Sequence, residues 1–173
     1  MNIRGKRDFG KLINELELTY GAELGVAGGE FSEHLLKTSN LKILFSIDRW
    51  TDHHDYKEYL VAKEKLSQYN ERSVILKLSF DEALQFFTDN SLEFIYIDGY
   101  AHTGFDKGKT LYDWWPKLKK GGVFAGHDYD EMYDDPPMIK IVDNFSKVND
   151  VEINVTEKGV NEEKFPSWYC IKK

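Results

Sequence analysis

Polar residues that could bind a ligand stand at the ends of five apolar segments of this 173-residue chain. Each segment has the length and composition of a buried strand and is followed by a turn or a helical pattern. In an open parallel sheet, ligands bind at the edge where the carboxyl ends of the strands meet. We therefore expect one site at this edge, formed by Glu23, Asp48, Ser79, Asp98 and the pair His127-Asp128.

The first segment ends in the turn Glu23-Leu-Gly25-Val-Ala-Gly-Gly29. Glycines between a strand and a helix let the backbone approach a ligand, although an ordinary turn of this kind also needs glycine. Ala27 stands where the dinucleotide-binding pattern has its middle glycine, and a carboxylate at Glu23 would repel a pyrophosphate. The same carboxylate can pair with a cationic amino group. The turn therefore favours a nucleoside that carries an amino acid over NAD.

Asp48 and Ser79 end the next two segments. An acidic residue at the end of the second strand can accept hydrogen bonds from ribose hydroxyls. The alternatives for Asp48 are a helix cap or a solvated carboxylate. Ser79 and Glu82 have the spacing of a capping box, which predicts the start of a helix and leaves room for contact with an adenine ring.

The elements that must position these residues alternate between strand and helix. We expect strands at 20–24, 42–48, 73–78, 92–98 and 123–126, the last preceded by a turn at 119–122, and helices near 9–16, 30–38, 56–69, 79–87, before 115 and from 136. Residues 151–156 alternate and 168–171 are apolar, which is typical of an antiparallel pair at a sheet edge. The pattern predicts a single α/β domain over 1–173. Its doubly wound, mostly parallel seven-stranded sheet carries a C-terminal antiparallel hairpin.

Composition excludes several classes of protein. The net charge is −7 without a basic stripe, so we expect no nucleic-acid partner. No apolar run approaches the roughly 20 residues that span a bilayer, and the first ten residues lack an apolar signal core, so we expect a cytoplasmic protein without a membrane partner. Cys170 is the only cysteine, which excludes an intrachain disulfide and a cysteine-based zinc site.

Three longer motifs carry a family resemblance: Glu23-Leu-Gly-Val-Ala-Gly-Gly-Glu-Phe-Ser32, Tyr96-Ile-Asp-Gly-Tyr-Ala-His102, and Leu118-Lys-Lys-Gly-Gly-Val-Phe-Ala-Gly-His-Asp-Tyr129. Together they resemble the class I S-adenosylmethionine-dependent methyltransferases, and specifically the "methyltransferase 24" group related to macrocin-type and catechol-type O-methyltransferases. The likeness extends from about Tyr20 to the end of the chain, including Ser167-Trp-Tyr. It implies S-adenosylmethionine as cofactor and a hydroxyl of a small molecule or carbohydrate as methyl acceptor.

The resemblance also implies roles for the residues at the strand ends. The methionine part of the cofactor would be held by Glu23, Gly25 and Gly29, the ribose by Asp48, the adenine edge by Ser79, and Asp98 would lie beside the sulfonium.

The same resemblance implies catalytic roles for His102, Asp98 and Asp128. His102 would act as general base, although a loop histidine hydrogen-bonded to backbone would look the same in the sequence. Asp98, Asp128 and His127 would bind Mg²⁺ or another divalent cation. His127 stands where some relatives have a carboxylate, which leaves open a softer ion or none. His53 and His54 are expected in solvent.

Two other functions remain open at this point: an NAD-dependent oxidoreductase and a non-catalytic nucleoside-binding module. We also expect a shallow acceptor pocket or one completed by a second subunit, and hence a homodimer.

Overall fold

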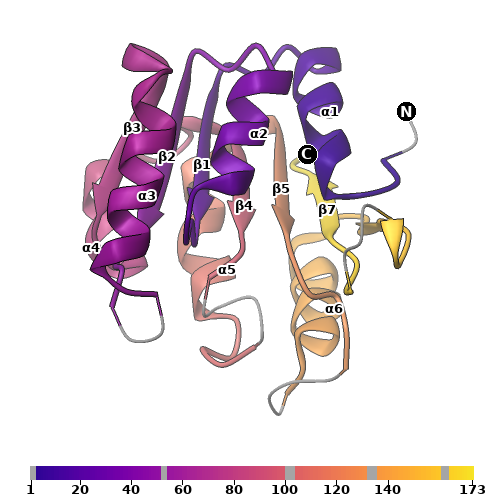
Figure 1. Ribbon diagram of the computed structural model, residues 1–173. Helices are drawn as coiled ribbons and strands as arrows, with labels where there is room; N and C mark the ends of the chain where they lie inside the picture. Colours follow the sequence, from indigo (N-terminus) through magenta and orange to yellow (C-terminus); the bar gives the residue numbers. More distant parts are fainter. Residues whose placement is uncertain (1–2, 52–53, 100–103, 132–135, 161–163) are drawn as a thin grey trace.

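The computed structural model describes residues 3–51, 54–99, 104–131, 136–160 and 164–173, and forms one open sheet with helices on both faces (Figure 1). The strand order is β3-β2-β1-β4-β5-β7-β6. β1 to β5 are parallel, whereas β7 runs antiparallel to both β5 and β6. The strand bounds are β1 Tyr20–Leu24, β2 Ile43–Asp48, β3 Ser73–Lys77, β4 Leu92–Ile97, β5 Leu118–Gly126, β6 Asn154–Val155 and β7 Trp168–Ile171. The predicted α/β fold, with its seven strands and C-terminal hairpin, is confirmed.

Helices cover both faces of the sheet. Figure 1 shows α1, α2 and α3 in front of the strands and α4, α5 and α6 behind them. The helices are α1 Phe9–Glu15, α2 Glu30–Thr38, α3 Tyr56–Ser67, α4 Phe80–Ala83, α5 Lys109–Trp114 and α6 Met138–Asn149, with short 3-10 turns η1 Lys6–Asp8, η2 Asn70–Arg72, η3 Leu84–Phe86 and η5 Trp115–Lys117.

Each face of the sheet has its own apolar core, as the apolar strands require. In β4, Ile95 and Ile97 belong to the cluster that includes residues of α4, α5 and α6. Phe94 and Tyr96 belong to the cluster that includes residues of α1, α2 and α3. Because side chains alternate along a strand, one short segment thus anchors both helical layers.

Three element boundaries differ from the sequence prediction. β5 begins at Leu118 rather than at 123. Leu118 pairs with Leu92 of β4 and Val123 pairs with Phe94, so the segment predicted as a turn, 119–122, forms an irregular part of the strand between these two pairs. The first hairpin strand is only Asn154–Val155. Val151 is instead tied to the end of α6, where its amide donates to the Ser146 carbonyl at 3.1 Å. α6 starts at Met138, so Pro137 is its N-cap rather than part of its first turn.

In the part of the chain that the structure describes, no helix combines the length and apolar character needed to cross a membrane.

Candidate cofactor site at the carboxyl edge of the sheet

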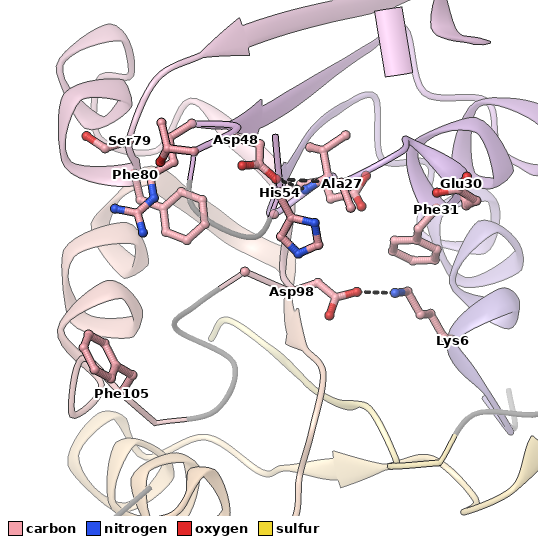
Figure 2. A pocket seen from close by; sticks show the side chains of 16 residues that line it. Lys6, Ala27, Glu30, Phe31, Asp48, His54, Ser79, Phe80, Asp98 and Phe105 are labelled. Carbon is pink, nitrogen blue, oxygen red and sulfur yellow. Dashed lines mark hydrogen bonds and ion pairs between the residues drawn. The ribbon is translucent and has the colours of Figure 1, made fainter. Parts of the chain in front are cut away.

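A cavity of about 610 Å³ opens at the carboxyl edge of the parallel strands. This volume lies within the roughly 300–1,000 Å³ that is usual for small-molecule sites, and residues of a single chain form it. Figure 2 shows side chains from both halves of the sheet around it. Five of the predicted site residues line it: Glu23, Gly25, Asp48, Ser79 and Asp98.

Glu23 is the most buried acid of the cavity, with 1% of its surface exposed. Its carboxylate accepts a hydrogen bond from Ser32 Oγ, which in turn lies 2.8 Å from Ser46 Oγ. Burial raises the pKa of Glu23 to about 8, and the nearby charges of Asp98 and Asp48 act in the same direction against the Ser32 hydrogen bond and Lys6. An ammonium group placed at Glu23 would favour the charged carboxylate.

The two glycines of the turn have different roles, one at the cavity and one at the start of α2. Gly25 has φ +95°, and a Cβ there would lie 2.3 Å from the amide nitrogen of Gly99, so only glycine allows the loops after β1 and β4 to touch. Gly29 has φ +81° and caps α2. A Cβ on Gly29 would lie 3.3 Å from Ala62 in α3, so its need for glycine comes from helix packing. The predicted ligand contact is therefore better founded for Gly25 than for Gly29.

Asp48 fixes the glycine turn as well as lining the cavity. Its Oδ2 accepts from the amides of Val26 at 2.8 Å and Ala27 at 3.1 Å, and its Oδ1 accepts from the amide of Trp50 at 3.0 Å. A carboxylate has about four acceptor positions, so one more strong hydrogen bond can form. As placed, Asp48 can take one ribose hydroxyl rather than two.

Ser79 caps α4, as its spacing to Glu82 predicted. The Ser79 hydroxyl accepts from the Glu82 amide while the Glu82 carboxylate accepts from the Ser79 amide, which completes the capping box. Ser79, Phe80 and Phe105 all line the cavity, and Figure 2 shows them on its side away from Lys6. A hydroxyl beside two aromatic rings is a suitable environment for a purine.

Asp98 forms an ion pair that the sequence analysis did not foresee. Its Oδ2 accepts from the ammonium of Lys6, which belongs to η1 at the beginning of the chain (Figure 2). Both side chains are 17% exposed. The Lys6 ammonium also lies 4.4 Å from the centre of the Phe31 ring and 5.2 Å from that of Tyr96.

His127 and Asp128 lie next to Asp98, at the end of β5. His127 Nδ1 is 2.5 Å from Asp128 Oδ1 and 3.7 Å from Asp98 Oδ1, so both carboxylates lie near the same ring nitrogen. Burial alone would lower the pKa of His127, but the hydrogen bond to Asp128 and the charge of Asp98 outweigh it and raise that pKa. Asp128 is 3% exposed.

This arrangement does not fit a divalent ion as it stands. Mg²⁺ is bound at about 2.1 Å by one or two carboxylates and several waters, and a positive group already on a carboxylate competes with it. Here a lysine ammonium contacts Asp98, and the His127 imidazole contacts Asp128 and lies 3.7 Å from Asp98. Among the described residues, no group of three or more His, Cys, Asp or Glu side chains could hold a metal ion.

The two histidine predictions have different outcomes. His102 lies outside the described residues, so its role as general base stays a prediction. His54, expected in solvent, is 40% exposed and also lines the cavity, and its Nδ1 lies 2.6 Å from Glu58 Oε2. Figure 2 shows its ring between Asp48 and Asp98 in that view. His54 precedes the N-cap Asp55 of α3, so helical spacing does not predict its contact with Glu58 in the first turn.

The fold and cavity define a class of protein: an open α/β sheet with a nucleoside-sized site at its carboxyl edge. A family model described as "Methyltransferase domain", of the methyltransferase 24 type, matches residues 22–129. The chain belongs to this family, and it is an S-adenosylmethionine-dependent methyltransferase. The resemblance on which the sequence analysis depended is thereby confirmed. A search of curated proteins gives no match.

Solved structures share the whole fold at low sequence identity. An O-methyltransferase from Bacillus cereus, in complex with SAH (S-adenosylhomocysteine), has a TM-score of 0.71 at 14% identity, covering 96% of this chain and 80% of that one. A methyltransferase from Geobacter sulfurreducens has a TM-score of 0.70 at 12% identity, covering 96% and 77%. Spermidine synthase from Thermotoga maritima has a TM-score of 0.67 at 14% identity, covering 98% and 61%. The same fold is thus found in enzymes as different in name as an O-methyltransferase and a spermidine synthase.

Proposed function

We propose that this protein transfers the methyl group of S-adenosylmethionine to a hydroxyl of a small-molecule or carbohydrate acceptor. The observation that carries the proposal is the convergence of Glu23, Asp48, Ser79 and Asp98 on one cavity in a chain of the methyltransferase family. The O-methyltransferase among the similar structures supports the choice of oxygen as the acceptor atom.

Each of the cavity residues would bind a different part of the cofactor. Glu23 would bind the ammonium of the methionine part, since an ion pair offsets the cost of ionising a buried carboxylate. Asp48 would accept one ribose hydroxyl, and Ser79 with Phe80 would surround the adenine. Asp98 would lie beside the sulfonium, where its negative charge attracts the positive sulfur.

The reaction is an in-line displacement at the methyl carbon. The bond from carbon to the acceptor oxygen forms while the bond from carbon to sulfur breaks, and the hydroxyl proton passes to a base. The main task of the protein is then to position the acceptor. His102 is the base we propose, because an imidazole can accept a proton near neutral pH.

A divalent ion at Asp98, Asp128 and His127 is the competing account of how the acceptor oxygen would be stabilised. It predicts that methyl transfer stops after rigorous chelation and that Asp128→Asn loses activity. Because the observed contacts do not favour such a site, no step of the proposed reaction depends on it. A homodimer likewise stays a prediction.

The direct test is transfer of labelled methyl from S-adenosylmethionine to panels of hydroxyl and amine acceptors. We expect a labelled product from at least one hydroxyl compound. Labelling of amines alone would contradict O-methylation. Cofactor binding with no transfer to any acceptor would favour a non-catalytic binding module.

His102→Ala tests the proposed base with the acceptor so found. Removing a general base lowers turnover by about 10²–10⁴-fold, so kcat should fall by that factor while the KM for S-adenosylmethionine changes little. Unchanged kcat would eliminate His102 from the reaction. Glu152→Ala, at an exposed position outside the cavity, is the control.

A further inference from the structure

The strongest unexplained feature of the site is the position of Lys6. Its ammonium contacts the carboxylate of Asp98 and the faces of two aromatic rings, Phe31 and Tyr96. A carboxylate with two ring faces is a complete binding site for one positive charge. The same ammonium also acts on the pKa of Glu23 and of His127, so it lies among the acidic groups at one end of the cavity.

The backbone holds this lysine in place from both sides. On one side, the Arg4 carbonyl accepts from the Glu157 amide at 2.8 Å, and the Arg4 guanidinium donates two hydrogen bonds of 3.0 Å to the Glu157 carboxylate. On the other side, the Arg7 carbonyl lies 2.8 Å from His34 Nε2 in α2. Figure 1 shows this first segment of the chain reaching the lower end of α1, near the carboxyl edge of the strands. The backbone on both sides of Lys6 is therefore anchored to other parts of the chain.

The ionisable residues around the cavity are mostly acidic, and Lys6 is one of the few positive charges among them. Four acids line it, namely Glu23, Glu30, Asp48 and Asp98, against two permanent cations among its described lining residues, Lys6 and Arg49. Asp98 is the acid at which the resemblance would place a divalent ion. In this chain a covalently attached ammonium already contacts that carboxylate, and Asp128 is paired with His127.

We propose that Lys6 supplies the positive charge beside Asp98 in place of a divalent ion, so that the site binds its cofactor and acceptor without metal. This inference rests on the proposed function, because the divalent ion that Lys6 would replace is one expected in a methyl-transfer site. An ammonium carries one charge and donates hydrogen bonds, so it can hold the Asp98 carboxylate in place and orient an acceptor oxygen. The ammonium of Lys6, in η1, would thus provide the positive charge that a divalent ion would otherwise provide.

The test measures Mn²⁺ binding by the loss of the electron paramagnetic resonance signal of the free aqueous ion, using the full chain without cofactor. We expect wild-type protein to leave the signal unchanged. Lys6→Ala should create a site with a Kd at least about tenfold lower than that of wild type, and adding Asp98→Asn should remove it. Lys6→Arg keeps the charge and should behave as wild type. Lys11→Ala is the control for loss of one charge, because Lys11 pairs with Asp8 outside the cavity.

Two results would overturn the inference: Asp98-dependent Mn²⁺ binding by the wild-type chain, or a Lys6→Ala variant that binds no more Mn²⁺ than wild type. The wild-type arm decides even if the variant folds poorly. A parallel calorimetric titration with S-adenosylhomocysteine in the presence of chelator separates this inference from the proposed function. Binding that appears only when Mn²⁺ is added would contradict the role of Lys6 and leave the methyltransferase proposal standing. Absence of binding with and without Mn²⁺ would contradict the methyltransferase proposal.

Discussion

At the scale of single residues, the site depends on one buried acid that is difficult to ionise. Glu23 is almost fully buried, and its pKa of about 8 means that the ligand-free protein carries it largely protonated near neutral pH. A cationic amino group brought beside it reverses the balance, because an opposite charge favours the carboxylate. If the cofactor binds at Glu23 as we propose, its binding is coupled to the loss of a proton from Glu23.

This coupling predicts that S-adenosylhomocysteine binds more tightly as the pH rises from about 6 to about 7.5, because Glu23 must lose its proton on binding. The limit for one released proton is a tenfold gain in affinity per pH unit. Calorimetry in buffers of different ionisation enthalpy should report the proton release. In Glu23→Gln the pH dependence should disappear, and a slope that persists in this variant would assign the proton to another group.

At the scale of elements, the strands position the residues of the cavity. The side chain of Glu93 stabilises the pairing of β4 with β1 and β5. Glu93, in β4, accepts hydrogen bonds from the Thr19 amide at 2.6 Å, the Thr19 hydroxyl at 2.8 Å and the Lys119 ammonium at 2.8 Å. Burial would raise the pKa of Glu93, but these hydrogen bonds outweigh it and lower the pKa to about 2. Glu93 thereby links β4 to the start of β1 and to the irregular part of β5.

Glu93→Gln should lower the free energy of unfolding by about 1–2 kcal/mol near pH 7. A lowered pKa gives stability that is present above the unfolded value of 4.5 and is lost as the pH falls through about 2. The difference between variant and wild type in urea unfolding should therefore shrink between these two pH values. Glu152→Gln, at an exposed position, should match wild type throughout. A constant difference across this range would mean that packing, rather than charge, explains the effect.

The strand-end rule accounts for what the sequence could predict. Glu23, Asp48, Ser79 and Asp98 follow apolar strands, and parallel strands bring their ends together, so the lining of the cavity followed from local patterns. Lys6 could not be predicted this way, because its position depends on Arg4 and Glu157, which are 153 residues apart in the chain. The start of β5 was missed for a similar reason. The Gly121 amide donates to the Lys172 carbonyl at 2.7 Å, a contact with the distant C-terminus that no local pattern reveals.

At the scale of the whole molecule, the fold alone does not determine the reaction. An O-methyltransferase and a spermidine synthase have similar TM-scores against this chain at the same 14% identity. Shared folds host different chemistries, so the reaction must be argued from the site. What the molecule as a whole adds is the cavity itself, built between the two halves of one sheet.

A ligand that binds only the folded chain should raise its melting temperature. At a concentration of 100 times Kd the gain is about 2.7 kcal/mol, which corresponds to roughly 5–10 °C for a domain of this size. We expect this rise with S-adenosylhomocysteine and none with NADH, measured by differential scanning fluorimetry. A rise with NADH alone would revive the oxidoreductase alternative.

The central claim is that Glu23 binds the amino group of a nucleoside carrying an amino acid. It is tested most directly by calorimetric titration of S-adenosylhomocysteine into the wild-type chain and into Glu23→Gln at one pH near 7.5. We predict saturable binding of one ligand per chain, weakened by about 10–100-fold in the variant, as expected for loss of a charge-assisted contact of about 1.5–3 kcal/mol. Equal affinity in the two proteins, or no binding by folded wild-type protein, would contradict the account.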